Sequence, residues 1–280
     1  MRHLPNLLTL ANLFFGCCAI ALTLSAQNFS VLGMSADPLQ AIEVPAVEQP
    51  YWGAIFIGLA ALCDAVDGAV ARALKVHSPI GADLDSLADV VSFGVAPAMM
   101  LYKMLWAAAA RQPDALDVSL WSTFPAFLIA VFAALRLARF NVSAPRYGSG
   151  AFEGMPTPAV GLFVATLPLL QWYNPLGLGP WLYNRWVLLG TIAVLCWAMV
   201  SRTRFLKGLP ASWKPAQAWP QLLLGVAALA LIPLIGWAAA PAVFGLYVLL
   251  SLFAPRSITS TTSLNTAGSI GDTHLTDAQQ

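Results

Sequence analysis

Five acidic residues crowd a stretch of 26 residues between two strongly apolar segments. The stretch, DAVDGAVARALKVHSPIGADLDSLAD, contains Asp64, Asp67, Asp83, Asp85 and Asp89, five of the thirteen Asp and Glu residues in the chain. Carboxylates gathered in a low-dielectric setting must either take up protons or bind a cation. Four of them on two rigid helices suit Mg²⁺ or Mn²⁺ and are enough to hold two ions. Paired divalent ions point to phosphoryl transfer, where they stabilise the attacking and leaving oxygens.

Helical spacing predicts that four of these carboxylates meet. Asp64 and Asp67 share one polar face of the first helix, and Asp85 and Asp89 follow each other at i and i+4 on the second. In an antiparallel hairpin, Asp64 then lies opposite Asp89 and Asp67 opposite Asp85, because each pair is equally far from the turn. Asp83 is rotated by about 200° from Asp85 and is predicted to occupy a helix N-terminal position instead.

The neighbouring residues fit a phosphate ligand. Arg72 lies one turn beyond Gly68 and can pair with an anionic oxygen, while Gly68 and Gly81 leave room for a ligand against each helix. Ser78 precedes Pro79, a pair that suits the first positions of a helix. Ser78 is therefore a candidate for helix capping, for ligand contact, or for both.

The elements that position these residues are predicted from hydrophobicity. Of the 280 residues, 59% are hydrophobic and only 10% are charged, which excludes an ordinary soluble domain. A run of about 20 apolar residues can cross a bilayer. We expect an all-α, polytopic membrane bundle of about eight transmembrane helices, with segments near 6–26, 51–74, 80–107, 119–140, 156–173, 182–200, 220–237 and 239–254.

These segments are predicted to form one membrane-embedded domain over residues 1–255. The last two spans, at about 220–254, are expected to form a hairpin or one long kinked helix. The first segment has a signal peptide as its alternative, although its apolar part is longer than usual. Residues 27–50 are expected to form an external loop, and the polar residues 256–280 a disordered cytoplasmic tail.

The basic residues predict the orientation of the chain. With the N-terminus in the cytoplasm, eleven of the fourteen Lys and Arg residues fall on the cytoplasmic side, as the positive-inside rule requires. The acidic stretch then lies at the cytoplasmic end of the second and third segments. The net charge of +1 gives no indication of a nucleic-acid partner.

The acidic stretch also resembles a known family. Its residues reproduce the pattern D-x2-D-G-x2-A-R-x8-G-x3-D-x3-D of the CDP-alcohol phosphotransferases, integral membrane enzymes that transfer a phosphoalcohol from a CDP-linked donor to an acceptor hydroxyl with divalent metal. The resemblance implies that Asp64, Asp67 and Asp85 bind metal and that Asp89 binds metal or acts as the base. It also implies that Gly68 and Arg72 contact the donor.

Four further segments resemble the membrane-integral bacterial phosphatidylserine synthases within that family: LPNLLTLANLFFG, DSLADVVSFGVAPA, LRLARFN and FEGMPTPA. The resemblance covers about residues 4–165 and implies CDP-diacylglycerol and L-serine as substrates, the inner cell membrane as location and a homodimer. It also implies a six-helix catalytic core over about 4–200, with the two spans at about 220–254 as an extension. Asn6, Thr9 and Ser78 become candidate donor contacts, although Asn6 and Thr9 equally suit caps of the first helix.

Serine as acceptor requires a cation for its carboxylate. Arg136 and Arg139 stand at i and i+3 near the cytoplasmic end of the fourth segment and are candidates, with membrane anchoring as their alternative role. The favoured mechanism is direct displacement at the phosphorus, with Asp89 as general base. Choline, glycerol phosphate and inositol phosphate remain alternative acceptors, and a cation transporter is the alternative from another functional class.

Overall fold

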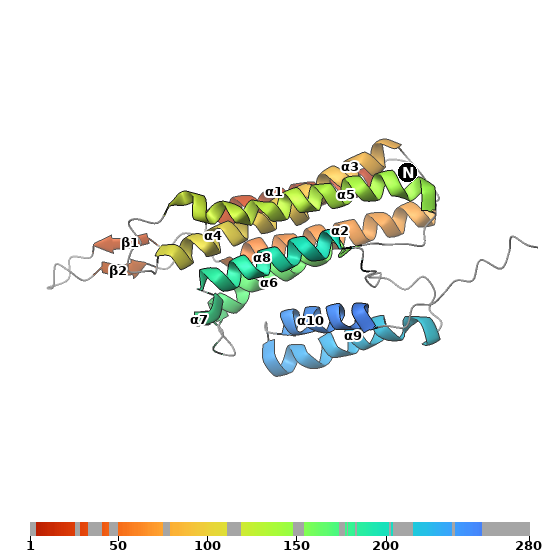
Figure 1. The fold of residues 1–280 in the computed structure, drawn as a ribbon. Coiled ribbons are helices and arrows are strands. Elements are labelled where there is room, and N and C mark those ends of the chain that lie inside the picture. Colours follow the sequence, from red (N-terminus) through yellow and green to blue (C-terminus); the bar gives the residue numbers. More distant parts are fainter. Residues whose placement is uncertain are drawn as a thin grey trace, which may run out of the picture.

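Each of the eight predicted apolar segments forms a helix or a set of consecutive helical pieces (Figure 1). The computed structural model describes residues 4–25, 29–32, 41–44, 50–74, 79–110, 119–147, 154–173, 177, 179–182, 184–201, 203, 215–236 and 239–253. The helices are α1 Leu4–Ser25, α2 Pro50–Leu74, α3 Pro79–Asp89, η1 Val90–Val95, α4 Ala96–Ala110, η3 Leu120–Phe127, α5 Leu128–Tyr147, α6 Thr157–Tyr173, α7 Gly179–Leu182, α8 Arg185–Val200, α9 Pro215–Ile235 and α10 Ala239–Phe253. The prediction of an all-α membrane bundle is therefore confirmed.

Four of the eight segments are long and apolar enough to cross a membrane. These are Pro5–Ser25, Trp52–Ala71, Ile80–Ala110 and Leu120–Val142. The other four contain shorter apolar helices, at Thr157–Gln171, Arg185–Val200, Leu222–Leu231 and Ala239–Ser251. Large apolar side chains stay exposed on the outer surface, among them Leu7, Phe14, Trp186 and Leu229. Such a surface suits contact with lipid tails rather than with water.

The third segment runs continuously but is not a uniform α-helix. Directly after Asp89, the backbone changes from α3 to the π-helix η1, and it returns to the α-conformation at Ala96. Within η1, Ser92, Phe93 and Gly94 are buried. A π-helix adds residues to each turn, so it rotates the buried face of α4 relative to the acidic face of α3. Hydrophobic spacing alone predicted one regular helix here.

The region between α1 and α2 differs from the predicted loop. It contains two short strands, β1 Phe29–Leu32 and β2 Ala41–Val44, which pair antiparallel with Phe29 opposite Val44 and Leu32 opposite Ala41. The strands lie at the end of the bundle opposite the N-terminus (Figure 1). Short strands of this kind follow from backbone pairing between chain segments, which a search for apolar helices does not detect.

Small residues allow the helices around the acidic stretch to pack closely. A Cβ atom at Gly16 of α1 would collide with Ser92 of η1, and one at Gly161 of α6 would lie 2.9 Å from the ring of Phe93. Phe93 is fully buried at this junction, together with Leu101 of α4. The π-helix is thus held between α1 and α6, which fixes the C-terminal end of α3.

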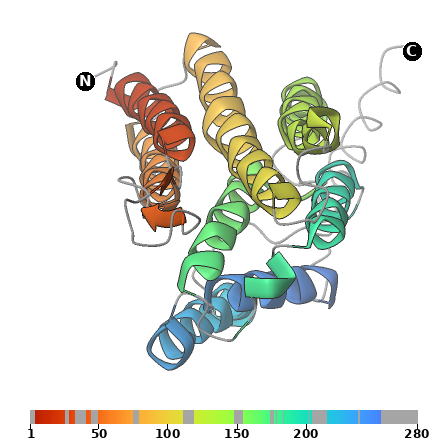
Figure 2. The same ribbon diagram turned by 90° about the vertical axis from the view of Figure 1, so that its left-hand side faces the viewer.

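The last two apolar segments form a hairpin, α9 and α10, rather than one kinked helix. Gly236, at the end of α9, has a φ of 54°, which a glycine adopts without strain. Figure 2 shows the hairpin on one side of the bundle beside α6 and far from α1, and α10 contacts α6 directly. The predicted disordered tail, 256–280, lies outside the described residues.

Candidate active site

Three of the predicted carboxylates form one close group. Asp64 and Asp67 come from the C-terminal half of α2, and Asp85 comes from α3. One carboxylate oxygen from each lies within 4.8 Å of the other two. Asp67 is buried, Asp64 and Asp85 are half-buried, and Oδ1 of Asp85 is buried without a hydrogen-bond partner among the described residues. The two antiparallel helices bring the acids together as their spacing predicts.

The geometry of this group fits a metal ion. At an effective dielectric constant of about 20, two unit charges 4.8 Å apart repel each other by about 3.5 kcal/mol. A divalent cation relieves this repulsion, and carboxylate oxygens are the ligands that Mg²⁺ and Mn²⁺ prefer. Oδ1 of Asp85, which has no donor among the described residues, is available as a ligand atom. The residues present therefore suit a divalent ion.

Asp89 stands beside the close group rather than in it. It lies one turn after Asp85, it is buried, and it interacts electrostatically with Asp64 and Asp85. The side-chain amide of Asn12, on α1, donates a hydrogen bond of 3.2 Å to Oδ1 of Asp89. The side-chain amide of Asn12 thus fixes the direction of this carboxylate at the edge of the acidic group.

The sequence reasoning did not single out Asn12. Asn12 is fully buried, and its own carbonyl oxygen accepts a hydrogen bond of 3.0 Å from the hydroxyl of Ser92. The absent side chain at Gly16 lets η1 come close enough for that bond. The available signal was the spacing of Asn6, Thr9 and Asn12, polar residues three apart in the first half of a mostly apolar helix.

Thr9 faces the acidic group. Its hydroxyl lies 2.9 Å from Oδ2 of Asp67 and 3.1 Å from the carbonyl of Pro5, and its side chain is buried. The contact of Thr9 with the CDP-linked donor stays a prediction. The helix α1 begins at Leu4, so the hydroxyl of Thr9 does not cap it. The hydroxyl instead supports a carboxylate of the close group. Asn6 lies half-buried in the first turn of α1.

The two candidate arginines of α5 differ in their surroundings. Arg136 is only 7% exposed, whereas Arg139 is exposed. Arg136 interacts electrostatically with Asp89, and its Nε has no hydrogen-bond partner in the part of the chain that the structure describes. Asn141, two residues after Arg139, donates a hydrogen bond of 2.8 Å to Ser86 on the outer face of α3. Of the two arginines, only Arg136 is buried within the bundle.

The remaining predicted positions lie around the α2–α3 connection. Gly68 is half-buried on α2, one residue after Asp67, and α3 begins at Pro79, as the sequence predicts. Asp83 lies in the second turn of α3 with an exposed side chain, so the prediction of a first-turn position at the helix N-terminus is wrong. As predicted, it is not part of the close group. Ser78 and the side chain of Arg72 lie outside the described residues.

Comparisons with known proteins agree with the geometry. The chain is 36% identical over 172 residues to the CDP-diacylglycerol–serine O-phosphatidyltransferase of Mycobacterium tuberculosis, which covers 58% of this chain and 54% of that protein. The Mycobacterium leprae protein of the same name is 34% identical over 194 residues, covering 66% and 58%. The Bacillus subtilis protein of that name is 28% identical over 211 residues, covering 73% and 90%.

The matched segment thus spans little more than half of the two mycobacterial relatives. The sequence pattern of the CDP-alcohol phosphatidyltransferases matches residues 2–197. This region contains the helices from α1 to α7 and most of α8, and it ends before α9. All members of the acidic group, together with Thr9, Asn12 and Arg136, lie inside the matched region. Together with its long apolar helices, this match identifies the chain as an integral membrane protein that belongs to the CDP-alcohol phosphatidyltransferase family.

Proposed function

We propose that this protein transfers a phosphatidyl group from CDP-diacylglycerol to the hydroxyl of L-serine and releases CMP. The names of its relatives in Mycobacterium and Bacillus support this reaction. The observation that carries the choice of serine is the buried guanidinium of Arg136 beside Asp89. A serine bound there presents its carboxylate to Arg136 and its hydroxyl to Asp89, two groups that a zwitterionic amino acid needs at once.

The donor end of the site is assigned to the close group of acids. Asp64, Asp67 and Asp85 would hold the divalent metal, as two ions of Mg²⁺ or Mn²⁺, and Asp89 would border it. The bound metal would supply Lewis-acid stabilisation of the phosphate oxygens of the donor. Gly68 leaves space for the donor against α2, and Arg72, Asn6 and Ser78 are proposed contacts for its phosphate and nucleotide groups.

The chemical step is a direct displacement at phosphorus. Asp89 accepts the proton of the serine hydroxyl while the serine oxygen forms a bond to the phosphorus that carries the diacylglycerol. The bond between that phosphorus and the oxygen bridging to CMP breaks, and CMP leaves with the electron pair. Asn12 orients the carboxylate of Asp89, and Arg136 holds the serine carboxylate, so the hydroxyl is aligned before the bond forms.

The cellular setting follows from the same reasoning. The excess of Lys and Arg on one side favours an inner cell membrane protein with its N-terminus and active site facing the cytoplasm. Both substrates are accessible there, because the lipid donor lies in the bilayer and serine is dissolved in the cytoplasm. We propose a homodimer as the assembly.

The reaction is tested with purified protein, CDP-diacylglycerol and Mn²⁺ or Mg²⁺, by measuring CMP release with each acceptor in turn. Serine should support rapid release, whereas choline, glycerol phosphate and inositol phosphate should not. CMP release that depends on one of those three acceptors and not on serine would refute the proposed acceptor. A cation transporter would release no CMP with any acceptor.

Arg136 and Arg139 provide a matched pair for the acceptor site. A hydrogen bond to a charged group contributes about 1.5–3 kcal/mol, so Arg136→Ala should raise the KM for serine by roughly 10- to 150-fold. The KM for CDP-diacylglycerol should change much less. Arg139→Ala removes the same charge from an exposed position of α5 and should leave both constants near the wild-type values. If Arg136→Ala changed the two KM values equally, or changed neither, both arginines would be assigned to membrane anchoring.

A further inference from the structure

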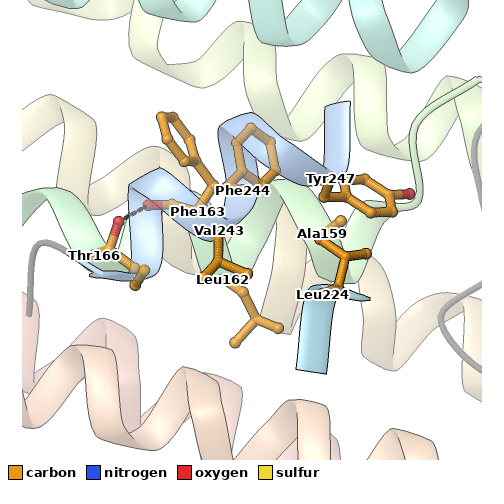
Figure 3. Close-up of a pocket in the computed structure, with 9 residues that line it drawn as sticks. Ala159, Leu162, Phe163, Thr166, Leu224, Val243, Phe244 and Tyr247 are labelled. Atoms are coloured by element: carbon orange, nitrogen blue, oxygen red, sulfur yellow. Dashed lines mark hydrogen bonds between the residues drawn. The ribbon is translucent and has the colours of Figure 1, made fainter. Parts of the chain in front are cut away.

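An open apolar groove lies between α6 and the C-terminal hairpin. It has a volume of about 260 Å³, and its walls come from α6, α9 and α10 (Figure 3). Figure 3 shows Ala159 and Tyr247 together at one end and Thr166 at the other. Between the two ends, the rings of Phe163 and Phe244 stack with their centroids 4.2 Å apart. The groove therefore runs along the helices, over the rise of about 10 Å that separates Ala159 from Thr166 on α6.

The lining of the groove is apolar apart from two hydroxyl groups. The hydroxyl of Thr166 donates a hydrogen bond of 2.6 Å to the main-chain carbonyl of Phe163, and the hydroxyl of Tyr247 points away from the other lining side chains in Figure 3. A water molecule in a cavity needs about two to four polar partners, so water is a poor occupant here. An empty groove would cost the lining side chains their dispersion contacts. The lining therefore favours an apolar occupant.

The hairpin leaves this space because it meets the bundle through one of its helices. α10 packs along both α6 and α9, whereas α6 and α9 do not pack along each other in the described parts of the chain. From α9, Leu224 lines the groove, while Leu229 of the same helix is 81% exposed. The material around an exposed apolar helix that lies in a membrane is the hydrocarbon of lipid tails. An acyl chain also runs roughly parallel to helices that cross the bilayer, so it matches the direction of the groove.

The groove lies on the far side of α6 from the acidic residues. Gly161 packs against η1, where an added Cβ would lie 2.9 Å from the ring of Phe93. At about 100° per residue, the lining residues Ala159 and Phe163 are turned by about 160° from Gly161. Figure 2 likewise shows α6 (green) between the α3–α4 segment (yellow) and the hairpin (blue). A chain in the groove is thus separated from the acids by a helix, which favours a resident lipid over CDP-diacylglycerol.

We propose that the groove between α6 and the hairpin binds one acyl chain of a resident phospholipid. The head group of this lipid lies at the end formed by Ala159 and Tyr247, because Ala159 is only two residues after the start of α6 at Thr157. In the proposed orientation of the chain, this end faces the cytoplasmic leaflet. The bound acyl chain fills the space between α6 and the hairpin and holds the two together through dispersion contacts. This binding site depends on neither the acceptor nor the reaction.

The test uses vesicles of phosphatidylglycerol that contain a small fraction of the same lipid with a photoreactive diazirine in the middle of one acyl chain. The reconstituted full-length protein is transferred to detergent, washed and irradiated, and the labelled residues are identified by peptide mass spectrometry. We expect label on residues that line the groove, such as Leu162 and Val243. Leu229 should carry about tenfold less label, because the lipid around this exposed side chain is washed away.

Two substitutions block the groove from opposite ends. Ala240→Phe and Ala159→Phe each place a ring in the space, and each should lower the retained label about tenfold while the melting temperature stays close to wild type. Leu229→Phe is the control, because it places a ring on the exposed face of α9. It should leave the label in the groove unchanged.

Several results would overturn the lipid site. Equal label on Leu229 and on the groove residues would indicate only general contact with lipid, and unchanged label in both blocked variants would place the retained lipid elsewhere. Loss of the label on addition of excess CDP-diacylglycerol would assign the groove to the donor. An unlabelled groove would exclude the site, and dissociation of a homodimer by Ala240→Phe would then assign it to an interface between two copies. Labelling in a protein without serine-dependent CMP release would refute the proposed function and leave the lipid site in place.

Discussion

Thr9→Val should weaken metal binding without changing the shape of the helix surface. Valine has nearly the shape of threonine but lacks the hydroxyl that lies 2.9 Å from Oδ2 of Asp67. Both side chains are buried, with Thr9 4% and Asp67 7% exposed, so water has little access to replace the lost donor. The carboxylate then keeps its charge but loses a group that fixes its direction.

Two opposing effects set the magnitude. Loss of the donor leaves more negative charge for a cation, which favours metal binding. It also frees Asp67 to turn away from Asp64 and Asp85, whose oxygens lie within 4.8 Å and repel it by about 3.5 kcal/mol each at an effective dielectric constant of about 20. The repulsion exceeds the 1.5–3 kcal/mol of a hydrogen bond to a charged group, so we expect misorientation to dominate. Loss of such supporting groups typically lowers metal affinity about 10- to 100-fold.

The assay is titration of Mn²⁺ into purified protein in detergent, with the dissociation constant as the readout. Thr23→Val is the matched control. Thr23 is also a buried threonine of α1, and its hydroxyl also bonds a carbonyl four residues earlier, at 2.7 Å from Ala19, but it contacts no carboxylate in the described structure. Thr23→Val should bind Mn²⁺ as the wild type does. Unchanged or tighter Mn²⁺ binding in Thr9→Val would refute the role given to its hydroxyl.

Three further predictions concern the acids and their support. Asp85→Asn should abolish CMP formation while the protein still inserts and can be purified; near-normal turnover at limiting Mn²⁺ would remove the metal role of this group. Asp89→Asn should still bind CDP-diacylglycerol in the presence of metal, but its kcat should fall by a factor of about 10²–10⁴, because the amide cannot accept the proton. Single-turnover CMP release measures this effect. Loss of donor binding would make Asp89 mainly a metal ligand. Gly16→Ala should lower the free energy of unfolding by about 1–3 kcal/mol, measured by thermal unfolding, because the added Cβ collides with Ser92. It should also lower kcat, because the collision moves Asn12 away from Asp89. Wild-type stability and kcat would contradict the close packing of α1 and η1.

The helices and the meeting of the acids could be predicted from the sequence. Both follow from local periodicity, because a run of apolar residues must be helical to satisfy its backbone in lipid and residues at i and i+4 share a face. Asp64, Asp67 and Asp85 are close in the chain and joined by a short connection, so two helices are enough to bring them together. The π-helix after Asp89 departs from the α-helical period, so the spacing of apolar residues did not predict it.

Which polar residue of each distant helix faces the acids depends on how the helices pack. Arg136 and Arg139 are about 60° apart around α5, and this small angle separates a buried guanidinium from an exposed one. Spacing within one helix shows which residues share a face but not what that face meets. The side chain of Asn12 reaches Asp89 across 77 positions of the chain, through helix packing that depends on Gly16.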